Sequence, residues 1–469
     1  MGALGRAASA VVALGCVAAA LLGAPPAAAA FEPATIDRYL ADGLAATGLP
    51  GMAVAVVRGG EVVHVAGYGT DGNGDPVTPR TPFRVGSLTK SFTAAAVLQL
   101  AAEGRVDLDA PVRAYLPGFP VVGPITVRHL LNQTSGLADP AIPSLNDPHQ
   151  DLAQRVASLR DVRPVSEPGR EFHYCDVNYQ VLAQLVEVVS GRSWAENLGE
   201  RVFAPLGAAD SVAGATTTQA GAPPGHVLLF GVPVARPELD GLVAGSGGVV
   251  STALDMGRWL AAQAPGGGPV LRPGDVALMQ TPPPGVAGGY AMGWQVVAPG
   301  RLAHTGVLST YSAIQVLLPG SGQGFVLLFN GSNALADTAG LAAGLADLLT
   351  GGTEPPGPRS TALVAAALGA AAVAVLALRV RQLARVPRWR GRARGWRAVA
   401  GPAWLLLPTA LLAGLPTLLS ALIGRSFTFW QLCLAMPDVV VLIAVWALSG
   451  VALAAARTVA ITRRPAARE

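Results

Sequence analysis

The spacing of apolar residues predicts one sheet built from the two ends of a central region, with helices between them. Near its start, helical spacing over 34–47 is followed by two β-branched runs, 53–57 and 62–65, that flank a hairpin turn. Near its end, the strand-like runs and a closing helix are Ala291–Val297, Ala313–Leu318, Phe325–Phe329 and Asp337–Leu349. Helical patterns fill the middle at Ser87–Glu103, Val127–Asn132, Tyr179–Val189 and Ala253–Ala262. The predicted fold class is α+β, an antiparallel sheet flanked by helices with an all-α insertion.

The first 30 residues have the pattern of a secretory signal peptide. Arg6 precedes an apolar run over 7–23, and the alanines at 28–30 offer small residues to a signal peptidase. A retained N-terminal anchor helix and lipidation at Cys16 are alternatives. The shortness of the run and its Ala-x-Ala exit favour cleavage near Ala30.

Three apolar runs near the other end predict membrane helices at about 360–378, 398–423 and 439–456. Each is long enough to cross ~30 Å of hydrocarbon at 1.5 Å per residue. Eight arginines separate the first two runs and four follow the third, whereas only Arg425 lies in the short loop between the second and third. The positive-inside rule therefore predicts a cytoplasmic C-terminus and an extracytoplasmic domain before the proline-rich linker at 353–359.

The positive net charge of the chain is concentrated at one end. The net charge is +4 and the pI about 9.2, but the basic excess lies in residues 379–469, and residues 31–378 are acidic. A nucleic-acid-binding role for the large domain therefore loses its main support. Cys175 is the only cysteine in that domain, so no disulfide can form within it, and the six histidines show no metal-ligand spacing.

The chain's only lysine follows a serine at helical spacing. Ser87-Leu88-Thr89-Lys90 places a hydroxyl and an amine at positions i and i+3, on one face of a helix. Where this spacing arises by chance, the usual structure is a serine that caps the helix and a lysine that is exposed to solvent. Arginine supplies every other basic residue here and cannot release a proton at working pH. Because lysine occurs at this one position, the sequence favours a catalytic pair, with Ser87 as the nucleophile and Lys90 as its base.

Several segments in the same order resemble the serine β-lactamase and penicillin-binding protein family, in its class C-related, DD-peptidase and esterase branch. The nucleophile segment corresponds to 82–91, a structural stretch typical of the branch to 125–137, and the second motif, usually Tyr-x-Asn, to Tyr174-Cys175-Asp176. His304-Thr305-Gly306 stands where most members have Lys-Thr-Gly, and 245–255 and 293–294 match further landmarks. The resemblance implies the fold of these enzymes for a hydrolase domain at 31–352.

The resemblance also implies a role for each matching residue. Ser87 attacks the substrate carbonyl and forms an acyl-enzyme, while Lys90 and Tyr174 share proton transfer, and either can be the base. The backbone N–H groups of Ser87 and Val307 form the oxyanion hole, which commonly contributes about 10²–10³ in rate. His304, the fourth residue assigned to catalysis, holds a substrate carboxylate together with Thr305 on an edge strand.

The substrate-binding residues that the resemblance implies are Asp176, Thr305 and Gly306. The chain departs from the family pattern at two positions. Asp176 replaces the usual asparagine, and an ionised carboxylate beside Lys90 would raise the lysine's pKa and leave more proton transfer to Tyr174, unless Asp176 is neutral. His304 replaces lysine, so recognition of a carboxylate would fade as the pH rises through ~6.5, the ordinary histidine pKa. Both changes argue against an efficient β-lactamase and are compatible with a peptidase, amidase or esterase.

The sequence therefore predicts a membrane-anchored extracytoplasmic serine hydrolase that needs no metal or cofactor. Its expected substrate is a small-molecule or peptide ester or amide, with D-alanyl cell-wall peptides as the leading candidate. Its expected partners are that substrate and the lipid bilayer, with no nucleic acid. The alternative is a membrane-bound sensor that binds a peptide or β-lactam without efficient turnover. Substrate identity and oligomeric state are not determined by the sequence.

Overall fold

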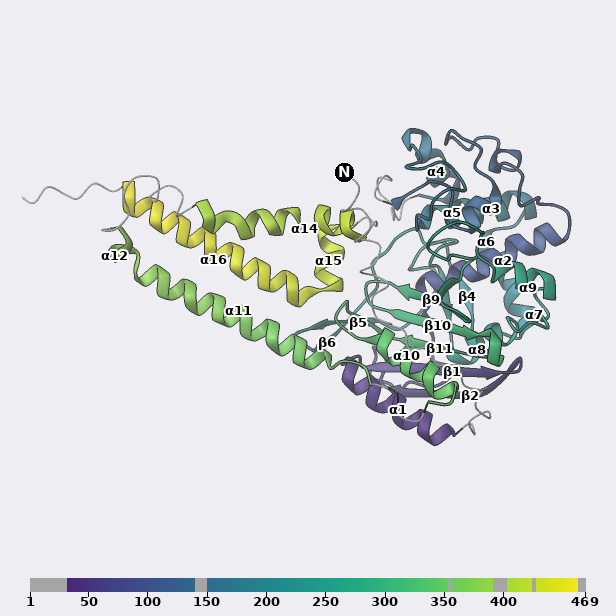
Figure 1. The fold of residues 1–469 in the computed structure, drawn as a ribbon, viewed down its shortest axis with the longest axis horizontal. Helices are drawn as coiled ribbons and strands as arrows, with labels where there is room; N and C mark the ends of the chain where they lie inside the picture. Colours follow the sequence, from purple (N-terminus) through teal and green to yellow (C-terminus); the bar gives the residue numbers. More distant parts are fainter. Residues whose placement is uncertain are drawn as a thin grey trace, which may run out of the picture.

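The computed structural model describes residues 32–139, 150–352, 355, 357–390, 403–423 and 427–462. The predicted signal peptide at 1–30 lies outside the described residues, as do parts of the predicted linker and of the arginine-rich segments. Figure 1 shows a domain of strands and helices from which a group of long helices projects to one side.

The domain is centred on a six-stranded antiparallel sheet with the strand order β2-β1-β11-β10-β9-β8. The strands are β1 (Gly51–Arg58), β2 (Glu61–Gly69), β8 (Gln295–Ala298), β9 (Arg301–Val307), β10 (Ser312–Leu318) and β11 (Gln323–Phe329). β1 pairs with β11 from Met52↔Phe329 to Arg58↔Gln323. The prediction that one sheet joins the two ends of the domain is confirmed.

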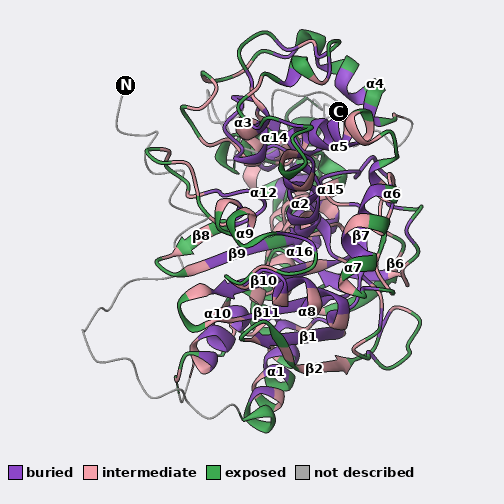
Figure 2. Ribbon diagram, turned by 90° about the vertical axis from the view of Figure 1, so that its right-hand side faces the viewer, coloured by how far each residue is buried: buried purple, intermediate pink, exposed green. Residues whose placement is uncertain are grey.

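Helices cover both faces of this sheet. On one face lie α1 (Pro33–Thr47) and α10 (Thr338–Leu349), where Leu40, Leu341 and Leu345 meet strand residues such as Phe329. On the opposite face, α8 (Ala253–Ala261) contacts β1, β2 and β11. Figure 2 shows the strands between these helices as a mostly buried layer, with exposed residues at the periphery.

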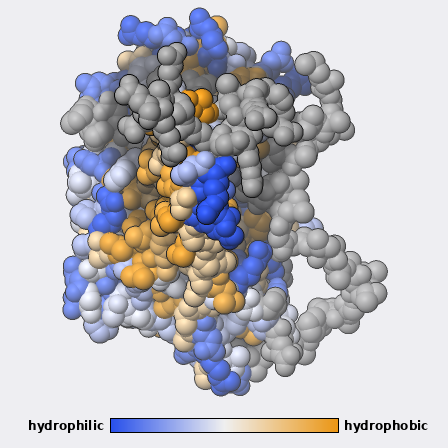
Figure 3. Space-filling view, turned by 90° about the vertical axis from the view of Figure 1, so that its left-hand side faces the viewer, coloured by the Kyte–Doolittle hydropathy of each residue, from blue (hydrophilic) through white to orange (hydrophobic). Residues whose placement is uncertain are grey.

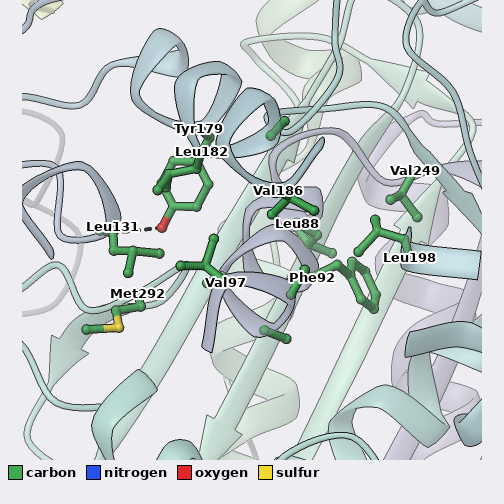
Figure 4. Packing of buried hydrophobic residues seen from close by; sticks show 14 of the residues in the cluster. Leu88, Phe92, Val97, Leu131, Tyr179, Leu182, Val186, Leu198, Val249 and Met292 are labelled. Atoms are coloured by element: carbon green, nitrogen blue, oxygen red, sulfur yellow. Dashed lines mark hydrogen bonds between the residues drawn. The ribbon is translucent and has the colours of Figure 1, made fainter. Parts of the chain in front are cut away.

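A second, larger core lies between the α8 face and a lobe of helices. α2 (Thr89–Ala102) runs through this lobe and is buried along nearly its whole length, so its apolar residues show no one-sided pattern. Figure 4 shows Leu88 and Phe92 close to Val186 of α5 (Asp176–Ser190). Tyr179 of the same helix lies beside Leu131, and its phenol donates to the Leu131 carbonyl at 2.8 Å. The other helices of the lobe are α3 (Val127–Leu131), α4 (Leu152–Ala157), α6 (Trp194–Leu198), α7 (Ala204–Leu206) and α9 (Pro273–Met279).

The predicted strand at 291–297 is wrong in its first half. Gly293 has a φ of 83°, and the Ala291 N–H donates to the Trp294 carbonyl at 2.7 Å, so 291–294 forms a turn before β8. The apolar pattern does not predict β9, because His304-Thr305-Gly306 interrupts it. It also misses two small sheets, β12-β5-β6 and β3-β7-β4. Their strands are β3 (Phe83–Arg84), β4 (Val212–Ala213), β5 (Gly225–Leu229), β6 (Val232–Arg236), β7 (Val249–Ser251) and β12 (Gly331–Ser332).

In the described part of the chain, three C-terminal helices are long and apolar enough to cross a membrane: Thr361–Ala384, Trp404–Ile423 and Pro437–Thr462, with mean hydropathies of 2.4, 1.9 and 2.5. They comprise α11 (Thr361–Ala384), a 3₁₀ turn leading into α14 (Leu407–Ile423), and α16 (Pro437–Thr462), with α12 (Val386–Arg390) and α15 (Phe429–Ala435) as short connections. This agrees with the three predicted runs, although 398–402 lies outside the described residues. Figure 3 shows apolar surface on the side of the molecule from which these helices project.

Candidate active site

Ser87 lies in a 3₁₀ turn, Gly86–Leu88, that leads directly into α2. Gly86 has a φ of 53°, a left-handed conformation that residues with a side chain rarely adopt. A Cβ on Gly86 would lie 3.1 Å from the backbone nitrogen of Val307, and one on Gly306 would collide with the carbonyl oxygen of Val85. The two glycines therefore let the backbone in front of Ser87 approach the end of β9.

Lys90 lies one helical turn beyond Ser87, and its side chain is 0% exposed. Its Nζ atom donates to Ser87 Oγ at 2.9 Å, to Asp176 Oδ1 at 2.6 Å and to the Ser246 carbonyl at 3.0 Å. An ammonium group has three N–H donors. The lysine is thus fully hydrogen-bonded inside the protein, and the serine hydroxyl is one of its acceptors.

Two opposing effects set the protonation of Lys90. Burial lowers its pKa, but the Asp176 carboxylate, together with the Tyr174 phenol, more than offsets this, so the pKa of Lys90 is raised. The ammonium form is therefore the major form at neutral pH. This is the effect on Lys90 that the replacement of asparagine by Asp176 leads us to expect.

Asp176 is the first residue of α5 and is placed by the loop that follows α3. Its backbone N–H donates to Asp139 Oδ1 at 2.9 Å. The start of a helix favours a negative charge, because its free N–H groups point outward. Asp176 thus lies where a carboxylate is stabilised both by the helix and by Lys90.

Tyr174 lies two residues before α5, next to the lysine and the end of the sheet. Lys90 Nζ lies 4.9 Å from the centroid of the Tyr174 ring. The Tyr174 ring also contacts Tyr290 edge-on, with centroids 6.0 Å apart, and lies 6.1 Å from the ring of His304. The structure therefore brings Tyr174 together with Lys90 and with β9.

His304 lies on β9, but its side chain is buried against Tyr290. Its Nδ1 lies 2.9 Å from the Thr305 carbonyl oxygen and its Nε2 lies 3.1 Å from the Tyr290 hydroxyl. A carbonyl only accepts, so Nδ1 carries the proton and Nε2 accepts from the phenol in the neutral ring. Burial raises the pKa of Tyr290, which keeps that phenol a donor.

The side chains of Thr305 and Val307 are exposed, whereas His304 and Gly306 between them are buried. The pairing of β9 with β8 ends at Ala303, so the stretch from His304 to Val307 is an edge of the sheet beside Ser87. This edge can take an extended substrate by backbone hydrogen bonding.

Three residues that support the site have no signal in the sequence pattern. Tyr290 orders His304 as described above. Gln133 accepts at its Oε1 from the Cys175 N–H at 3.1 Å and from Asn178 Nδ2 at 2.6 Å, which fixes the segment carrying Tyr174 and Asp176. These contacts join positions far apart in the chain, so no local spacing reveals them.

Glu238 is the third of these supporting residues. Its carboxylate accepts from the Ser309 N–H at 3.0 Å, the Thr310 N–H at 2.8 Å and Thr310 Oγ1 at 2.7 Å. These two residues form the turn that follows Val307, so the half-buried Glu238 carboxylate fixes the end of β9. In the part of the chain that the structure describes, no group of three or more His, Cys, Asp or Glu residues could hold a metal ion.

The sheet, the helical lobe and the serine–lysine pair between them define a serine hydrolase. The beta-lactamase family profile matches residues 36–350, and the chain belongs to this family. It is 31% identical over 322 residues to penicillin-binding protein 4 of Amycolatopsis lactamdurans, covering 61% of this chain and 82% of that protein. The family assignment and the hydrolase class predicted from the motifs are confirmed.

Solved structures share the fold. The octameric penicillin-binding protein homologue from Pyrococcus abyssi superposes with a TM-score of 0.60 at 24% identity, covering 68% of this chain and 78% of that one. A D-alanine carboxypeptidase from Burkholderia cenocepacia gives 0.53 at 22% identity, covering 66% and 97%. These likenesses confirm the predicted α+β, β-lactamase-like fold.

Proposed function

We propose that this protein is a membrane-anchored, extracytoplasmic hydrolase that cleaves an ester or amide through an acyl-enzyme on Ser87. The observation that carries the proposal is the 2.9 Å hydrogen bond between the buried Lys90 amine and Ser87 Oγ. D-alanyl peptides are the proposed substrate class. The relatives named as penicillin-binding proteins and as a D-alanine carboxypeptidase support this choice.

In the proposed acylation step, Lys90 in its neutral form takes the Ser87 hydroxyl proton while Oγ bonds to the substrate carbonyl carbon. The carbonyl oxygen becomes an oxyanion that the N–H groups of Ser87 and Val307 stabilise. Tyr174, with Lys90, returns a proton to the leaving amine or alcohol as the scissile bond breaks. Thr305 and Gly306 align the substrate on the edge of β9, and the His304–Tyr290 pair keeps that edge in place.

Deacylation repeats these transfers with water in place of the leaving group. Lys90 takes a proton from the water, hydroxide adds to the acyl carbonyl, and the Ser87 oxygen leaves with a proton returned to it. Because Asp176 raises the pKa of Lys90, only a small fraction of the enzyme has a neutral amine at neutral pH. We therefore expect the hydrolytic rate to rise with pH.

The three apolar helices are the proposed membrane anchor. Four arginines lie at the end of α11 and in α12, far from the hydrolase domain: Arg379 and Arg381 on α11, Arg385 directly after it, and Arg388 on α12. Positive residues favour the cytoplasmic side, so the domain lies outside the cytoplasm and the C-terminus inside. This orientation agrees with the predicted signal peptide.

The test is mass spectrometry of the purified full-length protein after incubation with a fluorophosphonate, with penicillin and with a D-alanyl thioester. We expect one covalent adduct on Ser87, absent in Ser87→Ala, whose ester hydrolysis falls by about 10⁴-fold or more. Ser91→Ala is the matched control, because Ser91 lies in the same helix and its hydroxyl donates to the Leu88 carbonyl instead. Full hydrolysis by Ser87→Ala would refute the proposal.

A sensor is the second candidate, and the Lys90–Asp176 pair favours it. A lysine held in the ammonium form is a poor base for both steps, so an adduct of a peptide or β-lactam that does form on Ser87 would be hydrolysed slowly and remain attached. A stable acyl adduct of the wild-type protein without release of hydrolysed product supports the sensor. Complete turnover of the D-alanyl thioester supports the hydrolase.

A further inference from the structure

The hairpin of β5 and β6 stands out from the hydrolase domain with apolar residues exposed on both faces. Leu229, Val232 and Val234 are 40%, 61% and 44% exposed, and Pro233 and Ala235 beside them are also exposed. Successive residues of a strand point to opposite faces, so neither face of β6 is covered. Among the residues that the structure describes, β6 pairs only with β5 and is the edge of its sheet. In water such an edge is a site of aggregation, which indicates that another phase or molecule covers it.

The tip of this hairpin has an unusual residue. Phe230 and Gly231 form its two-residue turn with φ values of 50° and 78°, the left-handed pair typical of Asn-Gly turns. A phenylalanine is strained in this conformation. Its retention at the tip indicates that the ring makes a contact that asparagine could not make.

Contacts of the tip place it among the apolar helices. The Phe230 ring lies 3.6 Å from the position of a Cβ on Gly369, and Ala365 is the neighbour of Gly231, so the turn packs on one face of α11. The backbone N–H of Phe230 donates to Asp438 Oδ1 at 2.6 Å, at the start of α16. Gly369 lies eight residues after the start of α11, roughly 12 Å along the helix.

The other end of β6 has the composition of a membrane–water interface. The Arg236 guanidinium lies 5.5 Å from the ring centroid of Trp430 on α15. Tryptophan is enriched at the level of the lipid headgroups, and arginine extends its charge toward them. The apolar stretch of β6 therefore lies between this polar boundary and the tip that reaches Gly369.

We infer that the β5–β6 hairpin is a fourth membrane contact, in which Leu229–Ala235 enters the outer leaflet beside α11 and binds lipid acyl chains. The inference rests on the proposed anchoring by the three helices. Its ligand is the bilayer, because the hairpin tip overlaps the first turns of a lipid-exposed helix. Pro233 lacks an N–H and weakens the edge as a template for a partner strand.

The test uses the full-length protein in phosphatidylcholine–phosphatidylglycerol vesicles, with Cys16 and Cys433 replaced by alanine. Cys175 is kept, because its buried thiol is 0% exposed and does not take the label. Single nitroxide labels are attached in Val232→Cys and Val234→Cys. We expect these labels to collide more with oxygen, which concentrates in lipid, than with a water-soluble nickel chelate. Val188→Cys is the matched control, since this valine is exposed on α5, and its label should show the reverse preference.

Leu376→Cys on α11 reports the anchor separately from the hairpin. A lipid-type signal at 376 with a water-type signal at 232 and 234 overturns the hairpin inference and leaves the anchor standing. A water-type signal at 376 overturns both. Labels at 232 and 234 that are shielded from both collision partners show a protein occupant and also overturn the inference. Unchanged hydrolysis of an activated ester in every variant shows that the hydrolase domain is folded.

Discussion

Replacing Asp176 with asparagine tests how the charge beside Lys90 controls the hydrolase. Asp176→Asn keeps the size of the side chain and a hydrogen-bond acceptor, but removes the negative charge 2.6 Å from the buried amine. At an effective dielectric constant of about 20, a pair of unit charges at this distance attract by about 6 kcal/mol. The remaining amide dipole and relaxation offset part of this, and an adjacent opposite charge commonly changes a pKa by about 1–3 pH units.

The expected result is a shift of the pH–rate profile toward lower pH. The pKa of Lys90 is raised in the wild-type protein, so activity that needs the neutral amine rises as the pH increases through that pKa. Removal of the carboxylate lowers the pKa of Lys90 and moves the rising limb down by about 1–3 pH units. At pH 7, kcat/KM should then increase about tenfold for each pH unit of that movement.

The assay is hydrolysis of an activated ester and of a D-alanyl thioester between pH 6 and 10. Because the chain has a single lysine, selective isotope labelling of lysine gives one side-chain NMR signal, which titrates with Lys90 alone. Asp109→Asn is the matched control, since it removes the same charge from the exposed Asp109–Arg128 pair. An unmoved profile alongside a lowered NMR midpoint would refute Lys90 as the base and assign that role to Tyr174.

Three further substitutions test the structure around the Ser87–Lys90 pair and the packing of the domain. Gly86→Ala forces a side chain into a left-handed position close to Val307, and we expect kcat to fall about 10²-fold; an unchanged kcat would contradict the proposed oxyanion hole. Tyr290→Phe leaves the buried Nε2 of His304 without its donor and should lower the free energy of unfolding by about 1–3 kcal/mol in denaturant titrations; a variant as stable as wild type would show that the bond contributes nothing. Leu341→Ala leaves a cavity where this buried side chain of α10 packs, and should lower the free energy of unfolding by about 2–5 kcal/mol, with the activity per folded molecule unchanged.

The sequence predicts the parts of this protein whose signals are local. The hairpin of β1 and β2, the helix of Lys90 and the three apolar runs each follow from spacing within about twenty residues. Ser87 and Lys90 are one turn apart on a helix, so their hydrogen bond is implied by that spacing alone. The closeness of Asp176 to Lys90, 86 positions away, came instead from the resemblance to a family.

Other parts depend on contacts that no spacing encodes. Tyr290 and Glu238 act through hydrogen bonds to residues in separate elements, so each looks like an ordinary polar residue in the sequence. β9 contains histidine, threonine and glycine at its functional end, which weakens the strand pattern where the site needs polar groups. The local signal is thus poorest at the strand that we propose aligns the substrate.

The pairing of β1 with β11 determines when the domain can become complete during synthesis. Val57 pairs with Gly324, roughly 270 residues further along, and closing such a loop costs about 5 kcal/mol in chain entropy. The central strand pair therefore forms only after almost the whole domain has been made. α11 begins at Thr361, shortly after β11 ends at Phe329. Closure of the sheet and synthesis of the first helix of the proposed anchor thus occur in the same short interval. A chain stalled before β11 would expose the apolar surfaces of β1 to aggregation.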